Sequence, residues 1–266
     1  MEATELCALM LAICLFATFL YSSASPMAEA ALPHLARPFL MGAGVALTTY
    51  LIIRSPFGRR TGAHFNPAIT LAYFFLGRVH RWDALFYVAF QFAGSLLGVF
   101  FAHQLLGDSL ATVPVCYAIT TPGTYGSAAA LIAEFVLSAL LLGIVLFSTN
   151  HKTLVKFSPV FVSLITIFYY GLCSSLSGFS VNPARSFASA FFAQVWLGIW
   201  IYFAAPGLGM LAAAFVYARF QGRDRIYCAK VFHDTESNCP FYCRFEQLLC
   251  EGIDTGTANR DLHTKR

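Results

Sequence analysis

Gly-Ala-His-Phe-Asn-Pro-Ala-Ile-Thr at residues 62–70 and Val-Asn-Pro-Ala-Arg-Ser-Phe at residues 181–187 decide the fold of this chain. Both stretches contain Asn-Pro-Ala, at Asn66–Pro67–Ala68 and at Asn182–Pro183–Ala184, and each tripeptide opens a short apolar run. A helix of about 11 residues is about 16 Å long, roughly half the hydrocarbon thickness of a bilayer. Matched short segments in the two halves of a hydrophobic chain indicate a site at the middle of the membrane.

The rest of the chain has the composition of a membrane protein. Hydrophobic residues make up 58% of its 266 residues and charged residues only 11%, whereas about a quarter of a soluble domain is charged. Since about 20 apolar residues make one crossing, the long apolar runs predict six transmembrane helices. The runs are roughly Leu6–Ala24, Pro38–Ile53, Trp82–Leu106, Ser127–Ser148, Phe157–Leu176 and Val195–Phe220. The expected fold is an all-α membrane protein with six transmembrane helices and two re-entrant half-helices.

The two halves of the chain form an inverted repeat. Each half has three spans with an Asn-Pro-Ala segment between the last two. Because three is an odd number, the second half must enter the membrane with the opposite orientation. We expect a transmembrane channel domain over residues 1–220, with repeats at about 1–106 and 127–220, and a cytoplasmic tail over residues 221–266.

Basic residues mark one side of the membrane. The connections on the other side hold only Arg37 as a basic residue. Because basic loops favour the cytoplasm, we expect a multi-pass protein of a bacterial inner membrane or a plasma membrane, with both termini cytoplasmic. The basic side holds Arg54, Arg59, Arg60, Arg78, Arg81, Lys152 and Lys156.

Several function classes lack support in the sequence. The net charge of +4 is modest, and no basic cluster is interleaved with exposed aromatic residues, so no nucleic-acid partner is expected. No nucleophile–base set, phosphate loop or cofactor fingerprint is present, so neither an enzyme nor a cofactor is expected.

Each Asn-Pro-Ala is well suited to start a helix inside the membrane. Asn is a favoured N-cap, and Pro is favoured at the first helical position. Two such starts that meet would direct two positive helix-dipole ends at one point. The Asn66 and Asn182 amides would donate to a passing water or small neutral solute, whereas cations and protons would be opposed. The alternative is two ordinary helix starts in tight turns.

The segments before the two tripeptides should be extended and line a water-filled path, because non-helical backbone at membrane depth is otherwise unfavourable. Their carbonyl groups would form a ladder of acceptors. The His64 side chain is either part of the pore wall or a packing histidine. The predicted lining backbone comprises Gly62, Ala63, His64, Gly178 and Ser180.

With these motifs, residues 1–220 resemble the aquaporin (major intrinsic protein) family. Supporting matches are Ala133–Glu134–Phe135, Gln91 and Pro206. The resemblance implies a homotetramer with one pore per subunit. It also implies that Glu5 and Glu134 accept hydrogen bonds from the loops that carry the half-helices, although Glu5 could instead lie among the lipid headgroups.

Arg185 follows Asn182 by three residues and matches the family's constriction arginine. An unpaired guanidinium inside a membrane is costly, so a functional role is the default, and a structural ion pair is the alternative. By ungapped spacing, the other constriction positions are Ala46, Tyr170 and Phe179. This set departs from the usual water-selective pattern and from the glycerol pattern, which leaves selectivity for water alone open.

Two features favour water over glycerol. Ser186 stands where glycerol facilitators resemble one another in carrying Asp, and Tyr202–Phe203 precede Pro206 as in water channels. The expected function is a passive channel for water and other small neutral solutes that excludes ions and protons. The alternatives are a glycerol or small-solute facilitator and a non-conducting membrane structural protein.

The tail carries a possible zinc site. Cys228, His233, Cys239 and Cys243 could bind zinc tetrahedrally, whereas a reducing cytoplasm argues against disulfides. The alternative is a tail with reactive or idle thiols. Residues after about Gly252 are expected to be disordered.

Overall fold

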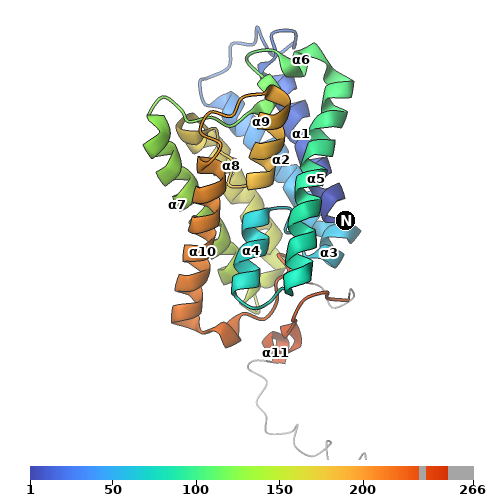
Figure 1. Ribbon diagram of the computed structural model, residues 1–266, viewed down its shortest axis with the longest axis vertical. Coiled ribbons are helices and arrows are strands. Elements are labelled where there is room, and N and C mark those ends of the chain that lie inside the picture. The colour runs from blue at the N-terminus through green and yellow to red at the C-terminus, as the bar shows by residue number, and fades with distance from the viewer. Residues whose placement is uncertain (234–237, 251–266) are drawn as a thin grey trace, which may run out of the picture.

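The computed structural model describes residues 1–233 and 238–250 of the chain. It is all-helical, and six of its helices are long and apolar enough to cross a membrane, which confirms the predicted fold class. They form one bundle (Figure 1). The long helices are α1 (Glu2–Tyr21), α2 (Ala36–Arg54), α5 (Arg81–Leu106), α7 (Gly126–Thr149), α8 (Ser158–Ser177) and α10 (Ile201–Gln221).

Two short helices take the place of a seventh crossing. They are α4 (Pro67–Phe75) and α9 (Pro183–Ala193), with 9 and 11 residues. In Figure 1, α9 lies above α4 along the long axis of the bundle, between α5 and α10. Their lengths of about 14 and 16 Å together match the hydrocarbon core of about 30 Å.

The packing repeats between the halves. α1 packs against α5 and α7 against α10, while α4 contacts α10 and α9 contacts α5. Thus each half-helix packs against the last long helix of the other half. α2 and α8, the central helices of the two halves, pack against each other. An inverted repeat predicts this exchange, because a pseudo-two-fold axis in the membrane plane relates the two halves.

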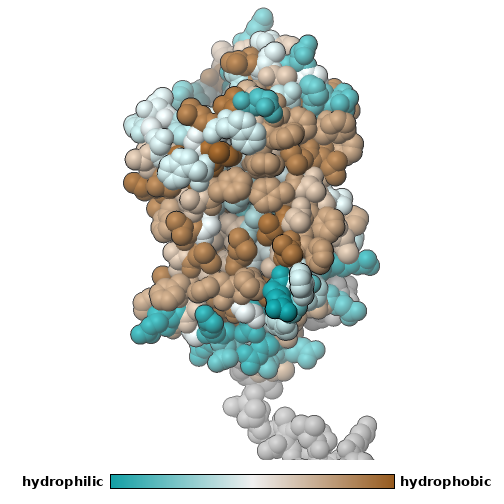
Figure 2. All heavy atoms as spheres, in the orientation of Figure 1, coloured by the Kyte–Doolittle hydropathy of each residue, from teal (hydrophilic) through white to brown (hydrophobic). Residues whose placement is uncertain are grey.

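On the face shown in Figure 2, apolar side chains cover the middle, and polar side chains gather at the two ends. This belt is the surface that lipid or neighbouring subunits would cover. Short helices complete the connections and the tail: α3 (Pro56–Thr61), α6 (Asp108–Ala111), η1 (Cys116–Ala118), η2 (Val155–Phe157), η3 (Arg223–Arg225) and α11 (Phe245–Cys250).

Two helix starts differ from the sequence prediction. α1 begins at Glu2 and not near Leu6, because Glu2 and Glu5 are buried acids with hydrogen-bond partners inside the fold. α10 begins at Ile201 and not near Val195, because Gln194 and Gly198 have positive φ and interrupt the chain after α9.

The tail does not leave the bundle after α10. Residues 226–232 are all buried, and several of them belong to the same apolar core as the long helices. The disorder expected after Gly252 falls outside the described residues.

Candidate functional site

The two half-helices begin with matching caps. Asn66 Oδ1 accepts a hydrogen bond from the Ala68 amide at 2.9 Å, and Asn182 Oδ1 accepts from the Ala184 amide at 3.1 Å. In both helices Pro occupies the first turn. Both asparagines have extended backbone conformations, as N-cap residues do.

The two caps are also joined across the repeat. Asn66 Nδ2 donates to the Val181 carbonyl at 2.8 Å, and Asn182 Nδ2 donates to the Phe65 carbonyl at 2.8 Å. One of the two amide hydrogens on each Nδ2 is therefore used in the fold. Because an amide nitrogen carries two hydrogens, these two bonds leave one hydrogen on each Nδ2.

The segments that lead into the caps are folded alike. In each segment a left-handed Gly ends the preceding helix, and the residues three and one positions before Asn also have positive φ. This conformation costs about 1–3 kcal/mol for each non-Gly residue, and surrounding contacts must hold it. The residues are Ala63 (56°), Phe65 (29°), Phe179 (50°) and Val181 (48°).

A buried carboxylate holds the second of these segments. Glu134 accepts hydrogen bonds from the Ser177 hydroxyl at 2.7 Å, the Ser180 amide at 2.9 Å and the Val181 amide at 2.7 Å. Both carboxylate oxygens are thus used, which offsets the burial of the acid within the membrane. The expected role of Glu134 agrees with this geometry.

In the first half, the carboxylate that accepts hydrogen bonds from the loop amides is that of Glu2 and not that of Glu5. Glu2 accepts from the His64 amide at 3.1 Å and from the Phe65 amide at 2.8 Å. Among the described residues, Glu5 accepts a side-chain hydrogen bond only from the Thr61 hydroxyl, at 2.6 Å. The sequence prediction missed Glu2, although its place before the first apolar run was a possible signal.

A cavity of about 80 Å³ lies beside the caps, large enough for several water molecules. Both asparagines contribute to its wall, as do several other predicted residues, whereas Gly62, His64 and Gly178 do not. The wall is mostly aliphatic. The predicted residues that line it are Ala63, Asn66, Tyr170, Phe179, Ser180, Asn182 and Arg185.

Arg185, Tyr170 and Phe179 lie together at this wall. The Arg185 side chain is 4% exposed, and its Nη1 has no hydrogen-bond partner among the described residues. The Tyr170 and Phe179 rings meet edge to face, with 4.7 Å between their centroids. A cationic donor beside two aromatic rings can orient a small polar solute while resisting cations.

Ala46 is the predicted constriction residue that the structure does not place at the cavity. It lies one turn after Gly42, which packs so closely on α8 that a Cβ there would be 2.9 Å from the Ile167 carbonyl oxygen. The face of α2 that lines the cavity instead carries Val45, Thr49 and Ile53. A shift of one helical residue turns a side chain by about 100°, so spacing alone could not fix this position.

His64 is a packing histidine in the structure. Its ring is fully buried, with Nδ1 3.1 Å from Thr70 Oγ1 and Nε2 2.8 Å from the Ala229 carbonyl oxygen. The ring also stacks between Tyr73 and Phe241. The pore-wall alternative for its side chain is therefore wrong.

The tail supplies a wall residue that the sequence did not suggest. Val231 lines the cavity, and its amide donates to the Gly62 carbonyl at 2.9 Å. Nothing in the sequence signals this contact, because it joins residues far apart in the chain. The four predicted zinc ligands in the tail also come together, with their ligand atoms all within 4.8 Å of one another.

Known proteins share this sequence pattern and this fold. The family model described as "Major intrinsic protein" matches residues 3–217. A putative aquaporin, NIP4-1 of Arabidopsis thaliana, is 31% identical to this chain, over 68% of this chain and 64% of its own length. A probable NIP-type aquaporin of Nicotiana alata is 30% identical, over 68% of this chain and 67% of its own length. The chain thus spans about two thirds of the length of these relatives.

A solved structure shows the same fold. The aquaglyceroporin from Plasmodium falciparum superposes with a TM-score of 0.67 at 17% identity, covering 84% of this chain and 96% of that one. These matches agree with the six apolar helices and the two capped half-helices, and this chain belongs to the major intrinsic protein family of membrane channels.

Proposed function

We propose that this chain is a passive channel for water and other small neutral solutes, and that it excludes ions and protons. The joined caps of Asn66 and Asn182 at the cavity carry this proposal. Two helix N-termini directed at one point produce a positive potential, to which Arg185 adds a full charge. A neutral solute can accept the remaining amide hydrogens, whereas a cation is repelled.

The wall favours small solutes and leaves room for more than water. Tyr170 and Phe179 narrow the cavity beside Arg185, while the aliphatic face of α2 offers no hydrogen bonds apart from Thr49. An aromatic and aliphatic wall also suits the carbon chain of glycerol, which makes a glycerol facilitator the second candidate. Ser186 argues against a facilitator, because glycerol facilitators resemble one another in carrying Asp at this position. The Ser186 hydroxyl forms hydrogen bonds with Thr120 and Ser180 inside the fold.

Osmotic shrinkage of proteoliposomes, followed by stopped-flow light scattering, tests these readings. Val231 is a tail residue in the cavity wall, and the same tail holds the cluster of predicted zinc ligands. The full chain is therefore measured both with and without a metal chelator. Fast water flux with slow glycerol entry supports a water channel, whereas comparable glycerol entry supports the facilitator. Flux no higher than bare lipid under both conditions would favour a non-conducting structural protein.

Arg185→Ala tests the constriction directly. Removing the guanidinium should widen the cavity and admit solutes larger than glycerol. Water flux should change less than the flux of these larger solutes. Arg219→Ala removes the same charge from an exposed position at the end of α10 and serves as the matched control. An unchanged solute profile in Arg185→Ala would contradict the assigned role.

We further infer a homotetramer with both termini in the cytoplasm. The family membership supports the tetramer, and the basic connections support the orientation. Light scattering of the detergent-solubilised chain, after subtraction of the detergent mass, gives the number of subunits. Protease access to the tail in right-side-out and inverted vesicles gives the orientation.

A further inference from the structure

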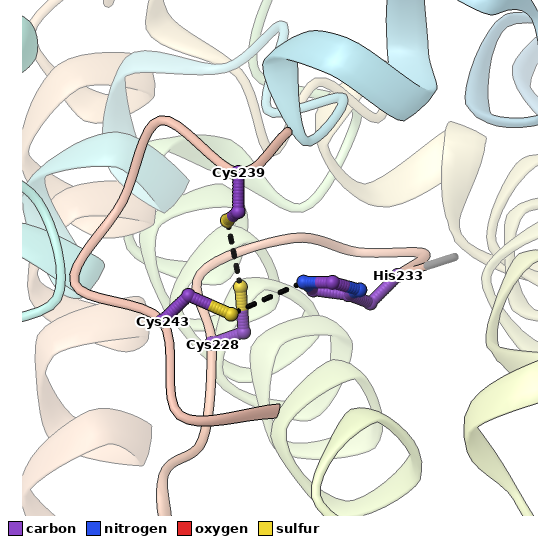
Figure 3. Close-up of side chains that lie close together, drawn as sticks. All are labelled: Cys228, His233, Cys239 and Cys243. Carbon is purple, nitrogen blue, oxygen red and sulfur yellow. Dashed lines mark hydrogen bonds between the residues drawn. The ribbon is translucent and has the colours of Figure 1, made fainter. Parts of the chain in front are cut away.

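The tail brings four metal-binding side chains into one cluster (Figure 3). Cys228 and Cys239 have their sulfur atoms 3.4 Å apart, and His233 Nε2 lies 3.1 Å from the Cys243 sulfur. All four ligand atoms lie within 4.8 Å of one another. The ligands of a tetrahedral zinc ion are about 3.5–3.8 Å apart, and three Cys with one His form a closed structural site.

A disulfide does not describe this cluster. The four cysteines of the tail's described part are free, and 3.4 Å between Cys228 and Cys239 is well beyond the bonded distance of about 2.05 Å. Three sulfur atoms and one imidazole that converge on one point have the geometry of a metal site.

We call the part of the cavity wall formed by Ile53, Ala63 and Val231 the tail-side mouth. Val231 belongs to the segment between Cys228 and His233. Val231 is 2% exposed. Its amide donates a hydrogen bond to the Gly62 carbonyl at 2.9 Å. The sequence predicted that this carbonyl would accept hydrogen bonds from a permeating solute. The tail thus contributes the Val231 side chain to the cavity wall and takes up a carbonyl group of the predicted lining backbone.

A second part of the tail packs on the residues on either side of Ala63. Phe241 stacks on the His64 ring with 5.2 Å between centroids. It also lies so close to Gly62 that a Cβ there would be 2.6 Å from its ring. The Tyr242 amide donates to the Arg78 carbonyl at 3.1 Å, which fixes this part of the tail to the bundle.

The four ligands bracket Val231, which lies in the cavity wall, and Phe241, which packs on Gly62 and His64. Cys228 and His233 stand three residues before and two after Val231, and Cys239 and Cys243 each stand two residues from Phe241. A metal ion bound by all four would join the two segments and fix both on the mouth. Without the ion, this link between the two segments is lost, which makes release of the tail easier.

We propose that Cys228, His233, Cys239 and Cys243 bind a structural zinc ion, and that this ion holds Val231 in the tail-side mouth and keeps the channel closed. The gating part rests on the proposed channel function. The metal site does not, because its readout is metal content. Loss of zinc opens the mouth, and rebinding closes it.

The metal site is tested on the purified full chain with the affinity tag removed. Elemental analysis should find one zinc ion per chain, as a single four-coordinate site requires. Cys239→Ser/Cys243→Ser should lose it, while Cys250→Ser, which changes a tail thiol outside the cluster, should keep it. Replacement of zinc by cobalt should give the absorption of a tetrahedral thiolate site. Absence of zinc, equal zinc in the double variant, or a Cys228–Cys239 disulfide by mass spectrometry overturns the proposal.

The gate is tested by water flux in proteoliposomes. Stripping zinc with a membrane-permeant chelator should raise the flux several-fold, and added zinc should reverse this in the wild type and in Cys250→Ser only. If the double variant does not fold, chelation of the wild type still tests the gate. Val231→Gly should raise the flux while zinc remains bound.

Two negative outcomes are distinguishable. Flux that is high and unchanged when zinc is demonstrably removed overturns the gate and leaves the channel function intact. A chain that binds zinc yet conducts in no condition, including Val231→Gly, overturns the gate together with the proposed channel function.

Discussion

Asn66 and Asn182 each donate to the carbonyl group of the residue that immediately precedes the other. The two hydrogen bonds, to Val181 and Phe65, are both 2.8 Å long. Each asparagine therefore caps its own half-helix with Oδ1 and fastens the opposite loop with Nδ2. The middle of the membrane is thus held by a reciprocal pair, and removal of either partner affects both halves.

Asn66→Ala removes a cap and a cross-link, whereas Asn66→Asp keeps the capping oxygen and removes only the donor. We expect Asn66→Ala to lower the free energy of unfolding by about 2–3 kcal/mol, from about 1 for the cap and 1–2 for the buried hydrogen bond. Asn66→Asp should also destabilise the chain, because its carboxylate faces the Val181 carbonyl. Unfolding in detergent measures both. Wild-type stability in Asn66→Asp would show that the cross-link contributes nothing.

Glu134→Gln places an amide NH₂ against hydrogen-bond donors. Since Glu134 accepts three hydrogen bonds and one to a charged group contributes about 1.5–3 kcal/mol, we expect a clear loss of stability and of water flux. Glu2→Gln should behave alike, and Glu5→Gln should have a smaller effect because Glu5 accepts only from Thr61. Glu29→Gln, at an exposed position, is the control. If Glu5→Gln is as damaging as Glu2→Gln, the assignment of Glu2 is wrong.

Gly94 and Gly209 allow long helices to approach closely. A Cβ at Gly94 would lie 2.2 Å from the Ala3 carbonyl oxygen, and one at Gly209 would lie 2.3 Å from the Phe135 carbonyl oxygen. Ala at either position should cost about 1–3 kcal/mol because the backbones must separate. Thermal unfolding in detergent measures this loss.

Gly207→Ala is the matched control on α10, since a Cβ there meets nothing within 4 Å. It should leave stability unchanged or raise it by up to about 1 kcal/mol through helix propensity. Equal melting temperatures for Gly207→Ala and Gly209→Ala would refute the close-packing account.

Phe179→Gly removes one of the two aromatic rings beside Arg185 without adding backbone strain, because glycine readily adopts the φ of 50° found there. The cavity should widen, so we expect glycerol entry to rise relative to water flux. Phe191→Gly removes a ring from the exposed surface of α9 and should not change this ratio. The same glycerol-to-water ratio in both variants would place the constriction elsewhere.

Short-range patterns predicted much of the fold. The long apolar runs located the six crossings, because a bilayer requires each to be about 20 residues long. Asn followed by Pro located the starts of α4 and α9, because capping is decided within a few residues. The odd number of spans in each half and the two tripeptides gave the inverted repeat, and the family match confirmed the resemblance.

Contacts between distant segments were decided only by the tertiary structure. Spacing predicted Ala46 at the constriction, but the α2 side chains that line the cavity are Val45, Thr49 and Ile53. Likewise, the sequence predicted Glu5 for the role of holding the first loop, whereas the position of the loop amides selects Glu2.

The tail shows the same division. Its sequence determined which side chains can bind a metal, because ligand chemistry belongs to each residue. It could not place Val231 against Gly62, since that contact depends on how a segment far along the chain returns to the bundle. Helix capping and local hydrophobicity are determined by neighbouring residues, whereas helix rotation and the docking of the tail depend on the packing of the whole molecule.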